Sequence, residues 1–295
     1  MAIVNSRAAI EPKTGKAAIF VNETIHSLIR KLFSNSEQGF TRTPDDLSTM
    51  YQDAAGTVPV TGVGQAVGLV LDKSKGLILG TQYLSTASFD FTTLEQTVAV
   101  TAKTKMSFTT NGAGGCYKLG LASKGTPVKI RLKGTCNIPW VLRNNADLIG
   151  SIPVNGGAFD ITSYNPAIFQ NLGALYFSLT AAGTITLEII EVTELKGNHA
   201  YQATSSMRPL LAATPQRLDY DTVDDKLITN LPAQLTGCTV IRSVPNVGTQ
   251  ILTGQTIPTT YNDNTDHCGL IVINRVLTPS ETSAITAEFN KRTGV

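Results

Sequence analysis

The residues best suited to chemistry in this sequence are four closely spaced acids: Asp219, Asp221, Asp224 and Asp225. Carboxylates at such spacing supply the hard oxygen ligands that calcium prefers. The segment lacks the EF-hand pattern, and in a strand Asp219 and Asp221 would share one face while Tyr220 points the other way. We therefore interpret the acids as a solvated strand edge and turn, and we predict no metal site.

Histidine is the usual acid–base residue near neutral pH. The chain has three: His26, His199 and His267. None stands in a Gly-x-Ser-x-Gly or His-Glu-x-x-His pattern. His267 neighbours Cys268, Asp263 and Asp266, but a catalytic dyad needs a geometry that local sequence does not define, and a polar loop is commoner. We predict no catalytic residue and no enzymatic activity.

Two further patterns are candidate enzyme signals. Paired carboxylates would indicate glycoside cleavage, and four acids in the β-rich part are candidates: Asp160, Glu188, Glu191 and Glu194. Nothing in the sequence pairs them, so alternating surface acids are the simpler interpretation. The glycines at 112–115 lack the Lys-Ser/Thr of a phosphate loop and are interpreted as a hairpin turn. We predict no cofactor.

Charge and apolar runs limit the partners. The net charge is +2 with scattered Lys and Arg, so the basic stripe that nucleic-acid binding needs is missing. Residues 1–7 do not read as a signal peptide, and no apolar stretch approaches a membrane span. We expect a soluble protein made in a cytoplasm, with neither nucleic-acid binding nor membrane insertion.

The cysteines and the single tryptophan each allow two interpretations. The four cysteines, Cys116, Cys136, Cys238 and Cys268, are widely separated and form no zinc pattern. Buried thiols are favoured over disulfides. Trp140 lies among apolar neighbours and is assigned to a core rather than to a sugar-stacking platform. The tyrosines that could also form such a platform are Tyr83, Tyr117, Tyr164 and Tyr176.

Short strands dominate the predicted elements. Residues 22–33 form an amphipathic helix, and a weak helical turn follows at 41–47. The apolar stripe of the helix at 22–33 must pack against another surface, either the chain's own sandwich or another subunit or attachment surface. The expected strands between 76 and 195 are 88–92, 97–101, 105–109, 117–121, 127–132, 138–142, 158–162, 174–179 and 184–193. Later strands are expected at 217–221, 238–244 and 269–273. Thr278, Pro279 and Glu281 then mark the start of a last helix.

Two separated segments carry a family resemblance. One runs from QDAAGTVPV at 52–60 to VGLVLDKS at 67–74, and the other from GNHAYQAT at 197–204 through RP at 208–209 to LDYDTVDD at 218–225. Together they resemble bacteriophage tail and fibre proteins with a laminin-G or concanavalin-like domain. The similar sequences have Gly where this chain has Thr222. The block between the segments looks like the jelly roll of a carbohydrate-binding module.

The resemblance implies a mainly β protein with one β domain inserted into another. The expected divisions are an N-terminal helical attachment or oligomerisation region at 1–46, the first part of a laminin-G-like region at 47–75, an inserted β-sandwich at 76–195, and the second part with a C-terminal helix at 196–295. Exposed loop sites tolerate such insertions. With only about 75 residues after Asp219, the laminin-G-like region is short and is expected to be completed by the N-terminal segment or by another subunit.

The function implied is that of a structural virion protein, assembled in the host cytoplasm and exposed on the particle. A tail or fibre protein that mediates assembly and host-glycan attachment is favoured. A capsid decoration or neck protein without receptor binding is the first alternative, and a polysaccharide depolymerase is the second. The expected partners are further copies of the chain in a trimer or higher oligomer, other virion proteins and host cell-surface polysaccharide.

Overall fold

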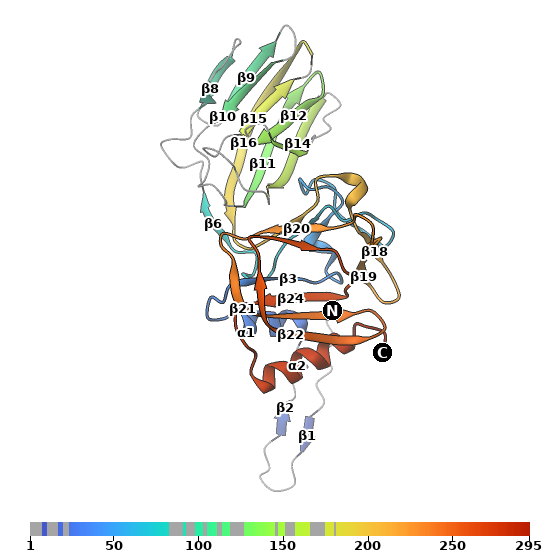
Figure 1. Cartoon of the computed structure of the whole chain (residues 1–295). Helices are drawn as coiled ribbons and strands as arrows, with labels where there is room; N and C mark the ends of the chain where they lie inside the picture. Colours follow the sequence, from blue (N-terminus) through green and yellow to red (C-terminus); the bar gives the residue numbers. More distant parts are fainter. Residues whose placement is uncertain are drawn as a thin grey trace.

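The structure is a computed structural model that describes residues 8–10, 17–19, 24–82, 91–92, 98–102, 105–110, 114–118, 127–144, 147–150, 157–165, 175–179 and 181–295. These residues form a mainly β molecule with two α-helices among them. Figure 1 shows an inserted sandwich at one end, a body in the middle, and helices with a short β-hairpin at the other end. The hairpin pairs β1 (Ala8–Ile10) with β2 (Ala17–Ile19).

The body contains two antiparallel sheets. The five-stranded sheet has the order β23 (Thr260–Asp263), β20 (Leu227–Asn230), β17 (Ala200–Tyr201), β5 (Leu69–Val70) and β4 (Met50–Tyr51). The four-stranded sheet has the order β22 (Gly248–Ile257), β21 (Leu235–Val244), β24 (Gly269–Ile273) and β3 (Gly39–Arg42). Strands from both flanks of the insert therefore build each sheet. A hairpin of β18 (Leu210–Ala212) and β19 (Arg217–Asp219) and two 3₁₀ turns, Leu47–Thr49 and Ser205–Met207, complete the body.

Strand β24 is buried on both of its faces, which explains its uninterrupted apolar sequence. Leu270 and Val272 join a cluster that includes Phe40 and Tyr261, between the two sheets. Ile271 and Ile273 point the other way and pack against the helices. The four-stranded sheet is thus the middle layer of the body.

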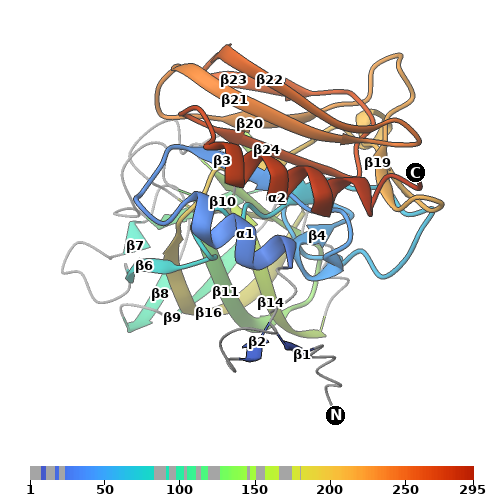
Figure 2. The same ribbon diagram turned by 90° about the horizontal axis from the view of Figure 1, so that it is seen from below.

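Helices α1 (Ile25–Leu32) and α2 (Pro279–Asn290) cover the far face of that sheet and lie side by side (Figure 2). The apolar stripe of α1 is therefore covered within the chain itself, with Ile25 and Ile29 only 1% exposed. The N-cap of α1 is Thr24, which accepts a hydrogen bond from the Ser27 amide, so the helix begins at Ile25 rather than at residue 22. The capping box of Thr278 and Glu281 at the start of α2 is confirmed.

The insert is a jelly-roll-like sandwich of two sheets. One has the order β14 (Gly157–Asn165), β11 (Val128–Cys136), β16 (Gly183–Leu195), β9 (Lys105–Thr110) and β8 (Val98–Ala102), with β6 (Leu79–Gln82) also pairing with β16. The other has the order β13 (Asp147–Gly150), β12 (Trp140–Asn144), β15 (Leu175–Leu179), β10 (Gly114–Lys118) and β7 (Phe91–Thr92). Trp140 lies between the sheets against Phe159, 1% exposed, so its assignment to the core is confirmed.

Two local predictions were wrong. The segment predicted as a helical turn at 41–47 begins instead in strand β3, because its backbone pairs with β24, a partner remote in sequence. The hairpin predicted around the glycines at 112–115 is not found, because β9 and β10 lie in different sheets and do not pair with each other. Gly114 and Gly115 belong to β10 itself, and residues 112–113 lie outside the described ones.

Candidate functional site

The root of the insert is a buried polar joint, formed where residues 71–74 leave the body and residues 195–199 return. Asp72 is fully buried and accepts four hydrogen bonds. Its Oδ1 accepts from the Thr41 amide at 2.9 Å and the Ser74 amide at 2.8 Å. Its Oδ2 accepts from the Ser74 hydroxyl at 2.7 Å and the Asn198 amide at 2.8 Å. One carboxylate therefore joins the outgoing strand, the returning strand and β3.

His199 closes the same joint from the returning strand. Its Nδ1 accepts a hydrogen bond from the Asp72 amide at 2.9 Å, and its Nε2 lies 3.2 Å from the Leu195 carbonyl oxygen. This arrangement requires the neutral tautomer with the proton on Nε2. Burial lowers the pKa of His199 to about 4, although the negative charge of Asp72 acts in the opposite direction. His199 is thus a structural residue, held neutral.

Arg42 fixes the joint to the five-stranded sheet. Its guanidinium is 1% exposed and donates to the carbonyls of Thr41 and Asn198 and to the hydroxyl of Thr229. The guanidinium also lies over the Phe40 ring, 4.8 Å from its centroid. A buried cation is stable only with such partners. The LDKS and GNHA segments singled out in the sequence thus meet here in space.

A second contact braces the insert against the body. The carbonyl of Ala55, in the turn of residues 53–56, accepts hydrogen bonds from the Tyr164 amide and the Ser163 hydroxyl, both at 2.7 Å. The rings of Tyr51 and Tyr164 lie 5.2 Å apart. Gly56 has a φ of +67°, and a Cβ there would lie 2.6 Å from the Tyr164 ring. Tyr164 therefore belongs to this contact and not to a sugar platform.

Further residues of the two segments form hydrogen bonds within the body. Arg208 donates from its guanidinium to the carbonyls of Gln52, Gln202 and Ala203, each at 3.0 Å. Asp53 accepts from the amides of Thr57 and Val58 and so fixes the turn that supports the insert. The motif residues thus form hydrogen bonds that hold the fold together.

The acidic cluster is explained by a turn. Carboxylate oxygens of Asp221, Asp224 and Asp225 lie within 4.8 Å of one another. Asp221 accepts from the amides of Val223, Asp224 and Asp225, while Asp225 accepts from the Asp221 amide. Asp219 is instead paired with Arg217 at 2.9 Å. These hydrogen bonds are those of an exposed turn, and they account for the spacing of the acids without an ion.

His267 lies in a buried network rather than in the polar loop that we expected. It is 0% exposed, and its Nε2 lies 2.8 Å from Asp263 Oδ2, which also accepts from the Tyr220 hydroxyl at 3.0 Å. Burial would raise the pKa of Asp263. The charge of His267 and its hydrogen bond to Asp263 act in the opposite direction, and the pKa of Asp263 is lowered overall. The loop is buried because His267 and Leu218 exchange backbone hydrogen bonds. His26, by contrast, lies 3.9 Å from Asp46 with its side chain 40% exposed.

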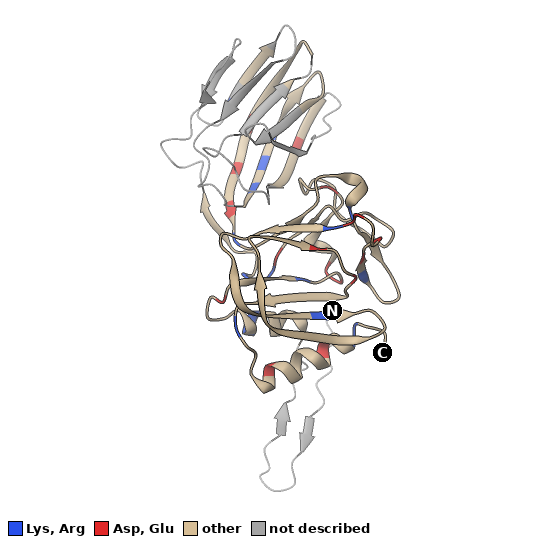
Figure 3. Ribbon diagram, in the orientation of Figure 1, with Lys and Arg blue, Asp and Glu red and all other residues tan. Residues whose placement is uncertain are grey.

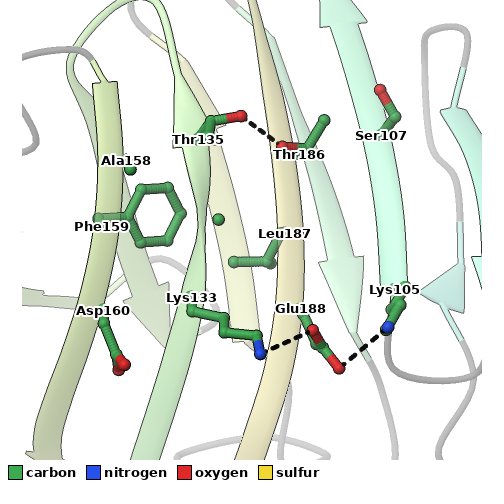
Figure 4. Close-up of a pocket in the computed structure, with 11 residues that line it drawn as sticks. Lys105, Ser107, Lys133, Thr135, Ala158, Phe159, Asp160, Thr186, Leu187 and Glu188 are labelled. Atoms are coloured by element: carbon green, nitrogen blue, oxygen red, sulfur yellow. Dashed lines mark hydrogen bonds and ion pairs between the residues drawn. The ribbon is translucent and has the colours of Figure 1, made fainter.

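The insert presents a shallow hollow of about 520 Å³ on the outer face of its six-stranded sheet (Figure 4). Its walls carry hydroxyls and paired charges, and the backbone of Gly134 lies in its floor. Thr135 and Thr186 form a hydroxyl pair at 2.6 Å. Glu188 lies between Lys105 and Lys133, at 3.2 and 3.4 Å.

The hollow also brings together two of the four candidate carboxylates. Asp160 forms a double hydrogen bond with Arg131, which lowers the pKa of Asp160. Desolvation would raise the pKa of Glu188, but hydrogen bonds from the two lysines lower it overall. Elsewhere, Glu191 pairs with Lys129, and Glu194 accepts from the Thr81 amide. Asp160 and Glu188 thus each pair with basic side chains that lower the pKa of the carboxylate.

The cysteines and the remaining tyrosines that the structure describes lie in strands or in the core. Cys238 and Cys268 are buried free thiols, and burial raises the pKa of Cys268 to about 11. Cys136 is buried, and the side chain of Cys116 lies outside the described ones. Tyr83 also lies outside the described residues. Tyr117 and Tyr176 are cross-strand partners in β10 and β15.

Comparison with known proteins gives no relative: no family model, no curated protein and no solved structure matches this chain. Neither of the two described helices is both long and apolar enough to cross a lipid bilayer.

Proposed function

We propose that this chain is a non-enzymatic structural component of a bacteriophage virion, most consistent with a tail or fibre protein. The observation that carries the proposal is the joint of Asp72, Asn198 and His199. Residues from both segments that resemble such virion proteins meet there to hold one sandwich out from another. The helical end and the insert lie at opposite ends of the molecule (Figure 1), so one end can be mounted while the other projects.

The position in the particle is tested by labelling purified phage with an antibody against the chain and imaging by electron microscopy. Label on the tail or its fibres is the expected result. Label spread over the capsid lattice would instead support a decoration protein. Absence of the chain from purified particles would contradict the virion assignment altogether.

We propose further that the hollow of the insert contacts host-surface polysaccharide. Hydroxyls of Thr135 and Thr186 and the charged ends of Lys105 and Lys133 point from neighbouring strands into one concavity (Figure 4). Such groups can hydrogen-bond the hydroxyls and acidic groups of a sugar chain. Acidic and basic residues stand on neighbouring strands of this sheet (Figure 3), and several of them form ion pairs across those strands.

A glycan array probed with the full-length chain tests this contact. The Lys133→Ala/Thr135→Ala variant is expected to lose any glycan that the wild type binds, while Lys291→Ala, an exposed lysine on the opposite end of the molecule, retains it. Equal binding by all three proteins would contradict the assignment of the hollow. Release of oligosaccharides from host capsule or lipopolysaccharide would overturn the non-enzyme proposal.

A further inference from the structure

Strand β22 is an open sheet edge. Among the residues that the structure describes, it is the outermost strand of the four-stranded sheet and pairs with β21 on one side only. Its sequence, GTQILTGQTI, holds no charged residue, and none occurs anywhere from 243 to 262 (Figure 3). The other long edge, β14, carries the exposed Asp160. Proteins that keep such edges unpaired usually protect them with charge or proline within the strand.

The backbone of β22 has donors and acceptors aimed outward. The Thr249 amide donates to the side chain of Asn290 and not to β21, so it points away from the sheet. Because the pattern alternates along a strand, the amides of Ile251 and Thr253 point outward as well. A bulge at Gly254, with a φ of +71°, ends this regular run.

The side chains sort onto two faces. Thr249 and Ile251 face helix α2, where Thr249 bonds the Thr286 carbonyl and Ile251 packs against the helical core. Gln250 and Leu252 lie on the opposite face and are exposed, Leu252 by 40%. A neighbouring strand would therefore gain both backbone hydrogen bonds and an apolar contact.

The occupant that fits this edge is a second copy of the same chain. A twofold contact brings the same strand edge of both copies together. An edge with charges of one sign would therefore repel its copy, whereas an uncharged edge does not. An antiparallel edge is also complementary to itself. With the axis beside Ile251, Ile251 faces its own copy and the Thr253 amide donates to the Thr249 carbonyl of the other copy. The Thr249 amide then exchanges its bond to Asn290 for one to the Thr253 carbonyl of that copy.

We propose that β22 pairs antiparallel with β22 of a second copy and makes one continuous sheet across two bodies. Sedimentation velocity of the full chain over a concentration series tests this contact. The wild type is expected to form a dimer or an even-numbered multiple. The Gln250→Lys/Leu252→Lys variant places four lysines around the axis and is expected to weaken association at least tenfold.

The matched control is Val276→Lys, at an apolar side chain 67% exposed outside β22, which should associate like the wild type. A monomer at all concentrations, an odd-numbered assembly, or a dimer that the double lysine variant leaves unchanged would overturn the proposal.

A cross-linking experiment keeps the test decisive if the lysine variant fails to fold. In the proposed register Gln250 lies opposite Leu252 of the other copy, at a separation of about 4.5–5.5 Å between Cα atoms that a disulfide can bridge. A mixture of Gln250→Cys with Leu252→Cys should form a covalent dimer under mild oxidation, and each variant alone should form far less. Equal yields from all three samples would contradict the register and the proposal.

Discussion

The body and the insert use polar residues in opposite ways. In the body, Arg42, Asp72, His199 and Asp263 are buried and hydrogen-bonded to specific partners far away in the chain. In the insert, the described charges of β11, β14 and β16 lie on an outer face in cross-strand pairs. A buried polar group cannot be replaced without leaving a partner unsatisfied, whereas an exposed pair can.

The same contrast shows in the sequence of each region. Asp72, Asn198, His199 and Arg208 in the body each form hydrogen bonds with partners remote in the chain. Strands β11 and β16 of the insert instead show the alternation of buried and exposed residues that one buried face requires.

Replacing Asp72 is the strongest test of the contrast between body and insert. Asp72→Ala leaves four donors without their acceptor in a buried site, so we expect the body to lose about 3–5 kcal/mol of unfolding free energy. Urea unfolding followed by far-ultraviolet circular dichroism measures this loss. Asp160→Ala, which removes an exposed carboxylate of the insert, should leave the transition midpoint nearly unchanged. Equal effects of the two substitutions would refute the contrast.

The joint should also respond to acid. His199 has a pKa of about 4 in the fold against 6.5 for a free histidine, so between these values the unfolded chain holds one more proton than the folded chain. Unfolding free energy should therefore fall as pH drops from about 6.5 toward 4, by up to about 1.4 kcal/mol per pH unit. The His199→Gln variant, measured by urea unfolding across the same range, should show a shallower slope. Parallel slopes would contradict the role given to His199.

Gly56 tests the brace between the two regions. Gly56→Ala puts a Cβ at a positive φ against Tyr164 and Leu69, so we expect a loss of about 2–3 kcal/mol. Gly237→Ala is the matched control, because Gly237 has a φ of +70° with open space around it and should cost only about 1 kcal/mol. Thermal unfolding compares the two. A Gly56→Ala loss no larger than that of the control would remove the packing argument.

The smallest expected effect is a gain. Thr222 has a φ of +64°, a conformation that β-branched residues adopt at a cost. Thr222→Gly should therefore stabilise the body by up to about 1 kcal/mol. Thr222→Ala relieves less of the strain and serves as the control. A destabilised Thr222→Gly protein would show that the Thr222 side chain makes a compensating contact.

Local patterns predicted much of the fold. Strand β24 at 269–273 and the start of α2 at Thr278 were predicted to the residue, because one is a continuous apolar run and the other carries a capping box. The strands expected at 97–101, 105–109 and 174–179 lie within a residue of β8, β9 and β15.

The misses are elements whose signal is not local. Strand β3 is short and preceded by a helix, and only its pairing with β24 makes it a strand. Strand β22 contains a bulge and several polar residues, so neither period two nor apolar content identifies it. Strands β6, β13, β20 and β23 were missed for the same reason of length, each having four residues.

The site was predictable only in its parts. Asp72, His199 and Tyr220 stood in quoted segments, but their roles depend on contacts across more than 40 residues of chain, which spacing does not reveal. The pairing of Asp160 with Arg131 and the hollow around Glu188 depend on the register of β11 against its neighbours, which no turn in the sequence specifies.

The joint has one more consequence, for how such a molecule changes over time. The chain leaves the body at Asp72 and re-enters at Asn198, and these two residues are joined by a single hydrogen bond of 2.8 Å. A domain whose own ends lie close together can be inserted between two such residues. The root of the insert is thus a natural exchange point, at which the outer domain can be replaced while the sheets of the body stay the same.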